Sequence, residues 1–393
     1  MRWINVQEIH ADGKHNAWPD ICRWRGKYYV TFNSGGKGHA NGHSICVLSS
    51  DDGQSWQKVI ETPAAQWTLS NDPQRGALCP KLLPTDERLV LLYYYYDDPD
   101  TDASDYDINR LKQQWFDLDG SQENFDRWIK HHDTSFRTAL SFTEDGQTFS
   151  PPQPLFEPGY RVWRPHTFGG RHYVIGFQCH GQSWSITPQL QQMIPVADKV
   201  EMFESATFFA SDDGLEWEKV ADIGADDTDE PDFDFTDRGR ALAVSRTGAS
   251  MQQPAMAYLS DPPYTQWNSL ELSAPLCSPA VRRVGDQWVV AGRGLYPNFK
   301  MPAQHAPDRA FDVWAPTKIW LLNDKSGELV EGATLPSWGD SAYPGIEVTP
   351  GGELLVVYYS CSQTIDVNLV MGPGPVPGKY APASIYLARV VMD

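Results

Sequence analysis

A short turn motif recurs along this chain and constrains its fold more than any other feature. Residues 49–56 read Ser-Ser-Asp-Asp-Gly-Gln-Ser-Trp, and residues 211–217 read Ser-Asp-Asp-Gly-Leu-Glu-Trp. In such a run the Asp side chain bonds to backbone amides of a tight turn, and Gly adopts a positive φ that other residues resist. Short β-prone runs flank each copy. The motif therefore predicts hairpin turns, each followed by an aromatic side chain that packs in an adjoining layer.

Three further segments vary the same pattern. Residues 141–149 form a copy that is one residue longer and ends in Phe, residues 260–267 carry Pro in place of Gly, and residues 323–327 form a shortened copy. A turn that returns this often between short strands indicates a repeat architecture. We therefore expect an all-β chain built from repeated units.

The composition limits the classes of partner. The formal net charge of −19 argues against nucleic acid and against anionic membrane surfaces. The six Cys occur singly, without a CxxC pair, which indicates buried thiols and not a zinc site or a disulfide scaffold. The first residues contain no apolar signal-peptide region, and no apolar run is long enough to span a bilayer, so we expect a cytoplasmic protein.

The repeated turns resemble the Asp boxes, or BNR repeats, of the sialidase (neuraminidase) superfamily. In that family they lie on the outer turns of a six-bladed β-propeller, away from the active site. The whole chain is similar to a bacterial group described as sialidase-like or exo-α-sialidase, through His-Asn-Ala-Trp-Pro-Asp at 15–20 and Gly-Asp-Ser-Ala-Tyr-Pro-Gly at 339–345. The resemblance implies a six-bladed β-propeller of four-stranded antiparallel blades and a glycosidase activity.

Strand-like runs along residues 1–393 group into six blades, which we interpret as one domain. Residues 3–9 are expected to complete the last blade beside residues 384–390, as the first strand of a closed propeller often does. Two long insertions are expected over a rim, at 97–135, where 122–132 is compatible with a helix, and at 182–200. The fifth blade is expected to contain a loop that ends near residue 315. The six blades are predicted to begin near residues 15, 76, 161, 229, 280 and 343.

The loops ahead of the innermost propeller strands converge on the central channel, so polar residues there are candidates for the site. Tyr343 matches the tyrosine nucleophile of retaining sialidases, and Glu230 matches the glutamate that acts as its base. A Tyr has a pKa near 10 and needs such a neighbour to act as a nucleophile. Asp340 is a further candidate carboxylate for catalysis.

The resemblance also implies a set of arginines that hold the carboxylate of sialic acid. Arg246 matches the second of them, Arg293 is a candidate for the third, and Arg164 is expected to join them. The first blade departs from the family, because Ala17 or a neighbour stands where the first arginine is expected. A carboxylate clamp without that arginine would lose much of its bidentate grip, which counts against plain sialidase activity.

Histidines supply alternative proton donors. The loop that carries the family's acidic Asp has His39 and His43 here and no carboxylate, and either His could replace that acid. Together with two other histidines they could instead bind a metal, but no HxH or HxxxH spacing supports this, so we predict no metal and no cofactor. The remaining expected substrate contacts are His15, Asp20, His166, Trp18 and Trp163.

Three functions are compatible with these residues, and each has a carbohydrate partner. The first is a glycoside hydrolase that removes a terminal, acidic sugar, since a Tyr nucleophile is a known exception to the two-carboxylate rule. The second is a polysaccharide lyase on uronic-acid glycans that uses Tyr and His for proton transfer. The third is a non-catalytic glycan-binding propeller.

Overall fold

The computed structural model describes most of the chain as strands and turns. The described residues are 1–36, 44–63, 66–67, 77–96, 136–156, 160–180, 203–224, 228–247, 253–294, 299–303, 306–313, 316–361 and 382–392. They include no α-helix, and therefore none that is long and apolar enough to cross a membrane. The insertions predicted at 97–135 and 182–200, with the helix considered at 122–132, lie outside the described residues.

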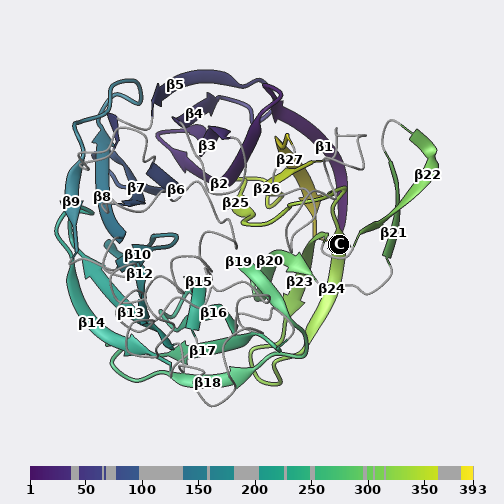
Figure 1. Cartoon of the computed structure of the whole chain (residues 1–393). Helices are drawn as coiled ribbons and strands as arrows, with labels where there is room; N and C mark the ends of the chain where they lie inside the picture. The colour runs from purple at the N-terminus through teal and green to yellow at the C-terminus, as the bar shows by residue number, and fades with distance from the viewer. Residues whose placement is uncertain are drawn as a thin grey trace, which may run out of the picture.

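Six antiparallel sheets form a ring around a common axis, with the first strand of each blade innermost (Figure 1). The predicted six-bladed β-propeller is therefore confirmed. The first blade comprises β2 (His15–Trp24), β3 (Lys27–Gly36), β4 (Ser44–Ser50) and β5 (Gln57–Pro63). The second comprises β6 (Ala77–Pro84), β7 (Leu89–Tyr96), β8 (Phe136–Thr143) and β9 (Gln153–Leu155). The third comprises β10 (Tyr160–Val162), β11 (His166–Phe168), β12 (Arg171–His180), β13 (Phe203–Ser211) and β14 (Glu218–Ile223).

The other three blades follow the same plan. They comprise β15 (Thr228–Phe235), β16 (Ala241–Thr247), β17 (Met256–Ser260) and β18 (Asn268–Glu271); β19 (Leu276–Val284), β20 (Gln287–Gly294), β23 (Thr317–Leu322) and β24 (Leu329–Thr334); and β25 (Gly345–Val348), β26 (Leu354–Ser360), β27 (Ser384–Val391) and β1 (Arg2–His10). The last blade thus takes strands from both ends of the sequence. Val6 of β1 lies opposite Ala388 of β27, so the predicted closing strand is confirmed.

A two-stranded hairpin replaces part of the loop expected in the fifth blade. Its strands, β21 (Phe299–Ala303) and β22 (Ala306–Val313), pair with Met301 opposite Phe311. They lie outside the ring, at the right of Figure 1. The prediction of a loop here was wrong. Proline is unfavourable in a central strand, but both strands of a two-stranded hairpin are edge strands, which tolerate it.

The turns that carry Asp-Gly share one pattern of hydrogen bonds. In the first turn, the Ser50 hydroxyl accepts a bond from the Gly53 amide at 2.9 Å. The Asp52 carboxylate accepts bonds from the amides of Gln54 at 2.7 Å and Ser55 at 2.8 Å. These amides lower the pKa of Asp52 to about 2. The same contacts recur at Thr143, Asp145 and Gly146, and at Ser211, Asp213 and Gly214.

This geometry corrects the register assigned to the motif. The hydroxyl that caps the first turn belongs to Ser50, the second residue of the run at 49–56. The copy that ends in Phe149 begins at Thr143, so it has the same length as the others and is not longer. Each turn joins the third and fourth strands of its blade. Buried apolar side chains fill the spaces between adjacent blades, for example Ile319, Leu354 and Tyr386 between the fifth and sixth.

Candidate functional site

Every blade has an Xaa-Pro step at an equivalent position, at or just before its inner strand. The residues before proline are Trp18, Cys79, Arg164, Glu230, Ser278 and Tyr343. All of them except Arg164 have a positive φ, between 50° and 56°. The pairing with the second strand shifts register at four of these steps, as expected of β-bulges. Proline is tolerated there because the inner strand is an edge, and a bulge re-aims the side chain beside it.

A positive φ in a non-glycine residue costs about 1–3 kcal/mol and is concentrated at functional sites. Five such residues lie at equivalent places, at or just before the inner strands of their blades. We therefore take this part of the central channel as the candidate site. An Xaa-Pro step at the expected start of each blade was visible in the sequence, but the sequence analysis did not use it. Cys79 and Ser278 are the two members of this set that it missed.

Tyr343 and Glu230 form a buried hydrogen-bonded pair. The Tyr343 hydroxyl donates to Glu230 Oε1 at 2.5 Å, and the Ser278 hydroxyl donates to Glu230 Oε2 at 2.8 Å. Burial raises the pKa of Tyr343 well above its usual value, and the nearby charge of Glu230 adds to this effect. The phenol is therefore neutral at physiological pH, with its proton already directed at a carboxylate.

Aromatic rings surround the Tyr343 side chain. Its ring centroid lies 5.3 Å from that of Trp163, 6.2 Å from that of Trp18 and 6.5 Å from that of Tyr359. Trp18 and Trp163 were predicted to contact substrate, and both are buried against Tyr343. They wall the site and hold the phenol in place.

Arg164 lies in the interior and connects several blades. Its Nε donates to Asp20 Oδ1 at 2.9 Å, and its Nη1 donates to the Pro279 carbonyl at 2.9 Å. Its Nη2 donates to the Tyr343 carbonyl at 3.4 Å. The predicted residues Arg164 and Asp20 are thus brought together, in a position that supports the backbone of Tyr343.

His166 belongs to the same buried network. Its Nε2 lies 2.9 Å from Asp232 Oδ1, and Arg282 Nη1 lies 3.1 Å from the ring. Burial alone would raise the pKa of Asp232, but His166, Arg164 and Arg282 outweigh it, so the pKa is lowered. The other oxygen of Asp232 accepts a bond from the Val281 amide of the next blade at 2.7 Å.

A second set of predicted residues lies around Asp340. Arg293 Nη2 donates to Asp340 Oδ1 at 2.7 Å, and His15 Nε2 lies 3.6 Å from Asp340 Oδ2. Arg293 Nε also donates to the Ser341 carbonyl at 2.8 Å.

Arg246, the remaining predicted arginine, lies beside Glu230. It forms an ion pair with Asp229 and places Nη1 3.7 Å from Glu230 Oε1.

Two predicted catalytic residues are not placed. His39 and His43 lie outside the described residues, so their role as acid stays a prediction. Among the residues that the structure describes, no three His, Cys, Asp or Glu side chains are grouped so as to hold a metal ion.

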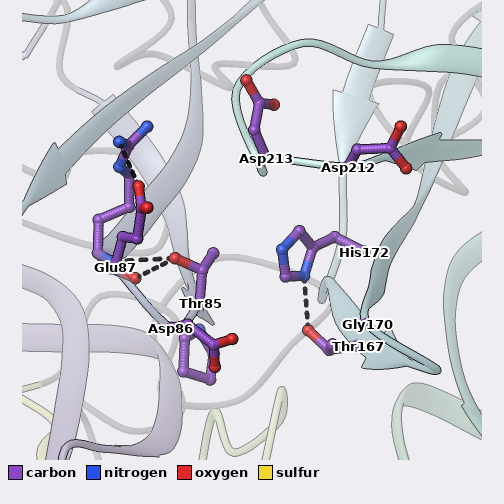
Figure 2. Close-up of a pocket in the computed structure, with 10 residues that line it drawn as sticks. Thr85, Asp86, Glu87, Thr167, Gly170, His172, Asp212 and Asp213 are labelled. Atoms are coloured by element: carbon purple, nitrogen blue, oxygen red, sulfur yellow. Dashed lines mark hydrogen bonds and ion pairs between the residues drawn. The ribbon is translucent and has the colours of Figure 1, made fainter.

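A separate cleft lies between the second and third blades, beside the outer turns (Figure 2). Its volume is about 320 Å³, and its lining includes Asp86, Glu87, Asp212 and Asp213. His172 points into it and shares a hydrogen bond of 2.7 Å with Thr167. None of the predicted site residues lines this cleft.

Solved structures share this architecture, whereas no family model and no curated protein matches the sequence. A protein of unknown function from Dyadobacter fermentans aligns with a TM-score of 0.63 and 15% identity, over 100% of this chain and 99% of its own. Trypanosoma rangeli sialidase aligns with a TM-score of 0.59 and 10% identity, over 96% of this chain and 55% of its own. The NanB sialidase of Streptococcus pneumoniae aligns with a TM-score of 0.56 and 11% identity, over 99% of this chain and 70% of its own.

The fold is a sialidase-like β-propeller. At these identities the similarity concerns the fold alone, because one fold supports many activities. This chain spans about half the length of the trypanosomal enzyme. The chemistry has to be argued from the residues of the site.

Proposed function

We propose that this protein is a glycoside hydrolase that removes a terminal sugar, with Tyr343 as nucleophile and Glu230 as its base. The hydrogen bond of 2.5 Å between the Tyr343 hydroxyl and Glu230 carries the proposal. A phenol is a weak nucleophile unless an adjacent base takes its proton, and Glu230 is placed to do so. The sialidases with the same fold, from Trypanosoma rangeli and Streptococcus pneumoniae, add support from outside this chain.

The reaction would proceed in two steps. The Tyr343 oxygen attacks the anomeric carbon while its proton passes to Glu230, and the bond to the leaving oxygen breaks as that oxygen gains a proton. The product is an aryl glycoside of the enzyme. Water then attacks the anomeric carbon and gives a proton to the group that protonated the leaving oxygen, while the bond to the Tyr343 oxygen breaks and Glu230 returns its proton to that oxygen. His39 or His43 is our candidate for the acid that protonates the leaving group.

We also assign the turns at Asp52, Asp145 and Asp213 to the Asp-box motif of the sialidase superfamily. Their shared hydrogen bonds and their place between the third and fourth strands support this assignment. Because no candidate site residue lies on the third and fourth strands that these turns join, we assign them a structural role and no part in catalysis.

The test is hydrolysis of a panel of aryl glycosides by the purified protein, with release of the aryl group as readout. Glu230→Gln should lower kcat by about 10²–10⁴, the range of a lost acid–base contribution, and Tyr343→Phe, which removes the nucleophile, should lower kcat at least as much. Tyr28→Phe is the matched control, because it removes the hydroxyl of another buried tyrosine, one that lies near the turn at Gly53 and is not a candidate site residue. Full turnover by both site variants would overturn the proposal.

With uronate-containing oligosaccharides added, the same panel distinguishes the hydrolase from the polysaccharide lyase and from the non-catalytic glycan-binding propeller. An unsaturated sugar that absorbs in the ultraviolet, without hydrolysis, would replace the hydrolase by a lyase. Binding without turnover that survives both substitutions would indicate a non-catalytic glycan-binding propeller.

A further inference from the structure

The arginines expected to hold an anionic sugar are already engaged by carboxylates of this chain. Arg164 pairs with Asp20 at 2.9 Å, and Arg293 pairs with Asp340 at 2.7 Å. Arg246 pairs with Asp229 and approaches Glu230. Each of these three positive charges is thus balanced within the protein.

Burial separates the three arginines further. The side chains of Arg164 and Arg293 are only 1% and 7% exposed. Both also donate to backbone carbonyls, so fewer of their N–H groups remain for a ligand. Arg246 is the most exposed of the three, at 13%, but it lies between Asp229 and Glu230.

A substrate carboxylate would meet an unfavourable field here. It would have to displace an internal carboxylate or lie close to Glu230 and Asp229, and like charges in a dry site repel strongly. A hydroxyl group adds no charge and can both donate to these carboxylates and accept from the arginine N–H groups. The same contacts that exclude an acid therefore favour a neutral polyol.

We propose that the sugar bound beside Tyr343 is uncharged and carries hydroxyl groups where a sialic acid or a uronate carries its carboxylate. This inference rests on the proposed glycosidase function and names its substrate class. It replaces the sequence-based expectation of an acidic sugar, which took the three arginines as free.

The first experiment compares matched pairs of aryl glycosides that differ only in the carboxylate: glucoside with glucuronide and galactoside with galacturonide, in both anomers, with an aryl sialoside added. The neutral member of the best pair should have at least a ten-fold higher kcat/KM. Preference for a uronide or for the sialoside would overturn the inference and leave the glycosidase proposal standing.

The second experiment measures binding without turnover. Saturation-transfer NMR with Tyr343→Phe should detect the neutral monosaccharides and not their uronic acids or sialic acid. If neutral sugars bind but no glycoside is hydrolysed by the unmodified protein, the hydrolase proposal fails and the substrate inference stands. If neither class binds, both fail.

A charge substitution provides an independent check. Asp229→Asn keeps the side-chain size and removes the main partner of Arg246, so it should raise binding of the uronic acids at least ten-fold relative to neutral sugars. Asp212→Asn, in the outer turn region and 89% exposed, is the matched control and should leave the ratio unchanged. An unchanged ratio in a folded Asp229→Asn protein would contradict the inference.

Discussion

At the scale of single residues, the site depends on how one carboxylate is held. Glu230 accepts from Tyr343 on one oxygen and from Ser278 on the other, and Arg246 approaches the first oxygen. The backbone of Glu230, Ser278 and Tyr343 adopts a positive φ that each residue would avoid in a free chain. The packing of the ring therefore stabilises a strained arrangement that presents the Glu230 carboxylate and the Tyr343 phenol to each other.

Ser278→Ala should weaken catalysis without removing either reacting group. Loss of one hydrogen bond to a carboxylate corresponds to about 1–2 kcal/mol, so kcat should fall roughly ten-fold while KM changes little. Ser141→Ala is the control, because Ser141 is also buried and donates to the Ser150 carbonyl far from the channel. Steady-state kinetics decide the point, and an equal loss of kcat in both variants would show a general effect of removing a buried hydroxyl.

Lys81 makes a different prediction, on stability. It is fully buried, with Nζ 5.2 Å from the centre of the Trp163 ring. Burial, together with the charge of Arg164, lowers its pKa from 10.5 to about 8. Between pH 8 and pH 10.5 the unfolded chain binds the proton that the folded chain has released, so this group raises the free energy of unfolding as pH rises.

The measurement is the difference in free energy of unfolding between the unmodified protein and Lys81→Met. From pH 8 to pH 10.5 the free energy of unfolding of the unmodified protein should rise by about 3 kcal/mol relative to that of the variant, since one pKa unit corresponds to 1.36 kcal/mol. Denaturant titrations at several pH values supply it. A difference that stays constant over this window would contradict the burial of a charged amine at this position.

At the scale of elements, the outer turns stabilise the blades and take no part in the reaction. Asp213→Ala should lower the free energy of unfolding by about 1–2 kcal/mol, because two backbone amides lose their acceptor. The activity per folded molecule should stay unchanged. Asp212→Ala changes an exposed neighbour and should have little effect, as exposed ion pairs contribute little. Thermal unfolding and kinetics on the same samples test both statements.

The sequence could predict what depends on local pattern. Strand alternation and Asp-Gly turn chemistry act over a few residues, so the blades and the closing strand β1 were predicted. Tyr343 and Glu230 were found by resemblance, and they lie in contact. The pairing of Arg164 with Asp20 could not be predicted from the sequence, because the two residues are 144 positions apart and their contact depends on which blades face each other.

At the scale of the whole molecule, the ring is closed by one blade that joins the two ends of the sequence. In that blade β27 pairs with β26 on one side and with β1 on the other. Carboxylates also connect neighbouring inner strands: Asp20 accepts from the Leu82 amide at 2.9 Å, and Asp232 accepts from the Val281 amide at 2.7 Å. Because the site draws Tyr343 and Glu230 from different blades, its geometry depends on closure of the entire ring.

Removal of residues 1–10 should therefore affect function as well as stability. Without β1, β27 becomes an exposed edge and the last blade loses apolar cover from Val6, so the melting temperature should fall by several degrees or more. Turnover should fall with it, because the blade that carries Tyr343 is no longer held at its outer side. A synthetic peptide of residues 1–12 added in excess should restore part of both. The control is replacement of residues 299–313 by a short Gly-Ser linker, since β21 and β22 lie outside the ring (Figure 1). An N-terminal deletion that melts and turns over like the unmodified protein would show that β25, β26 and β27 hold the last blade in place without β1.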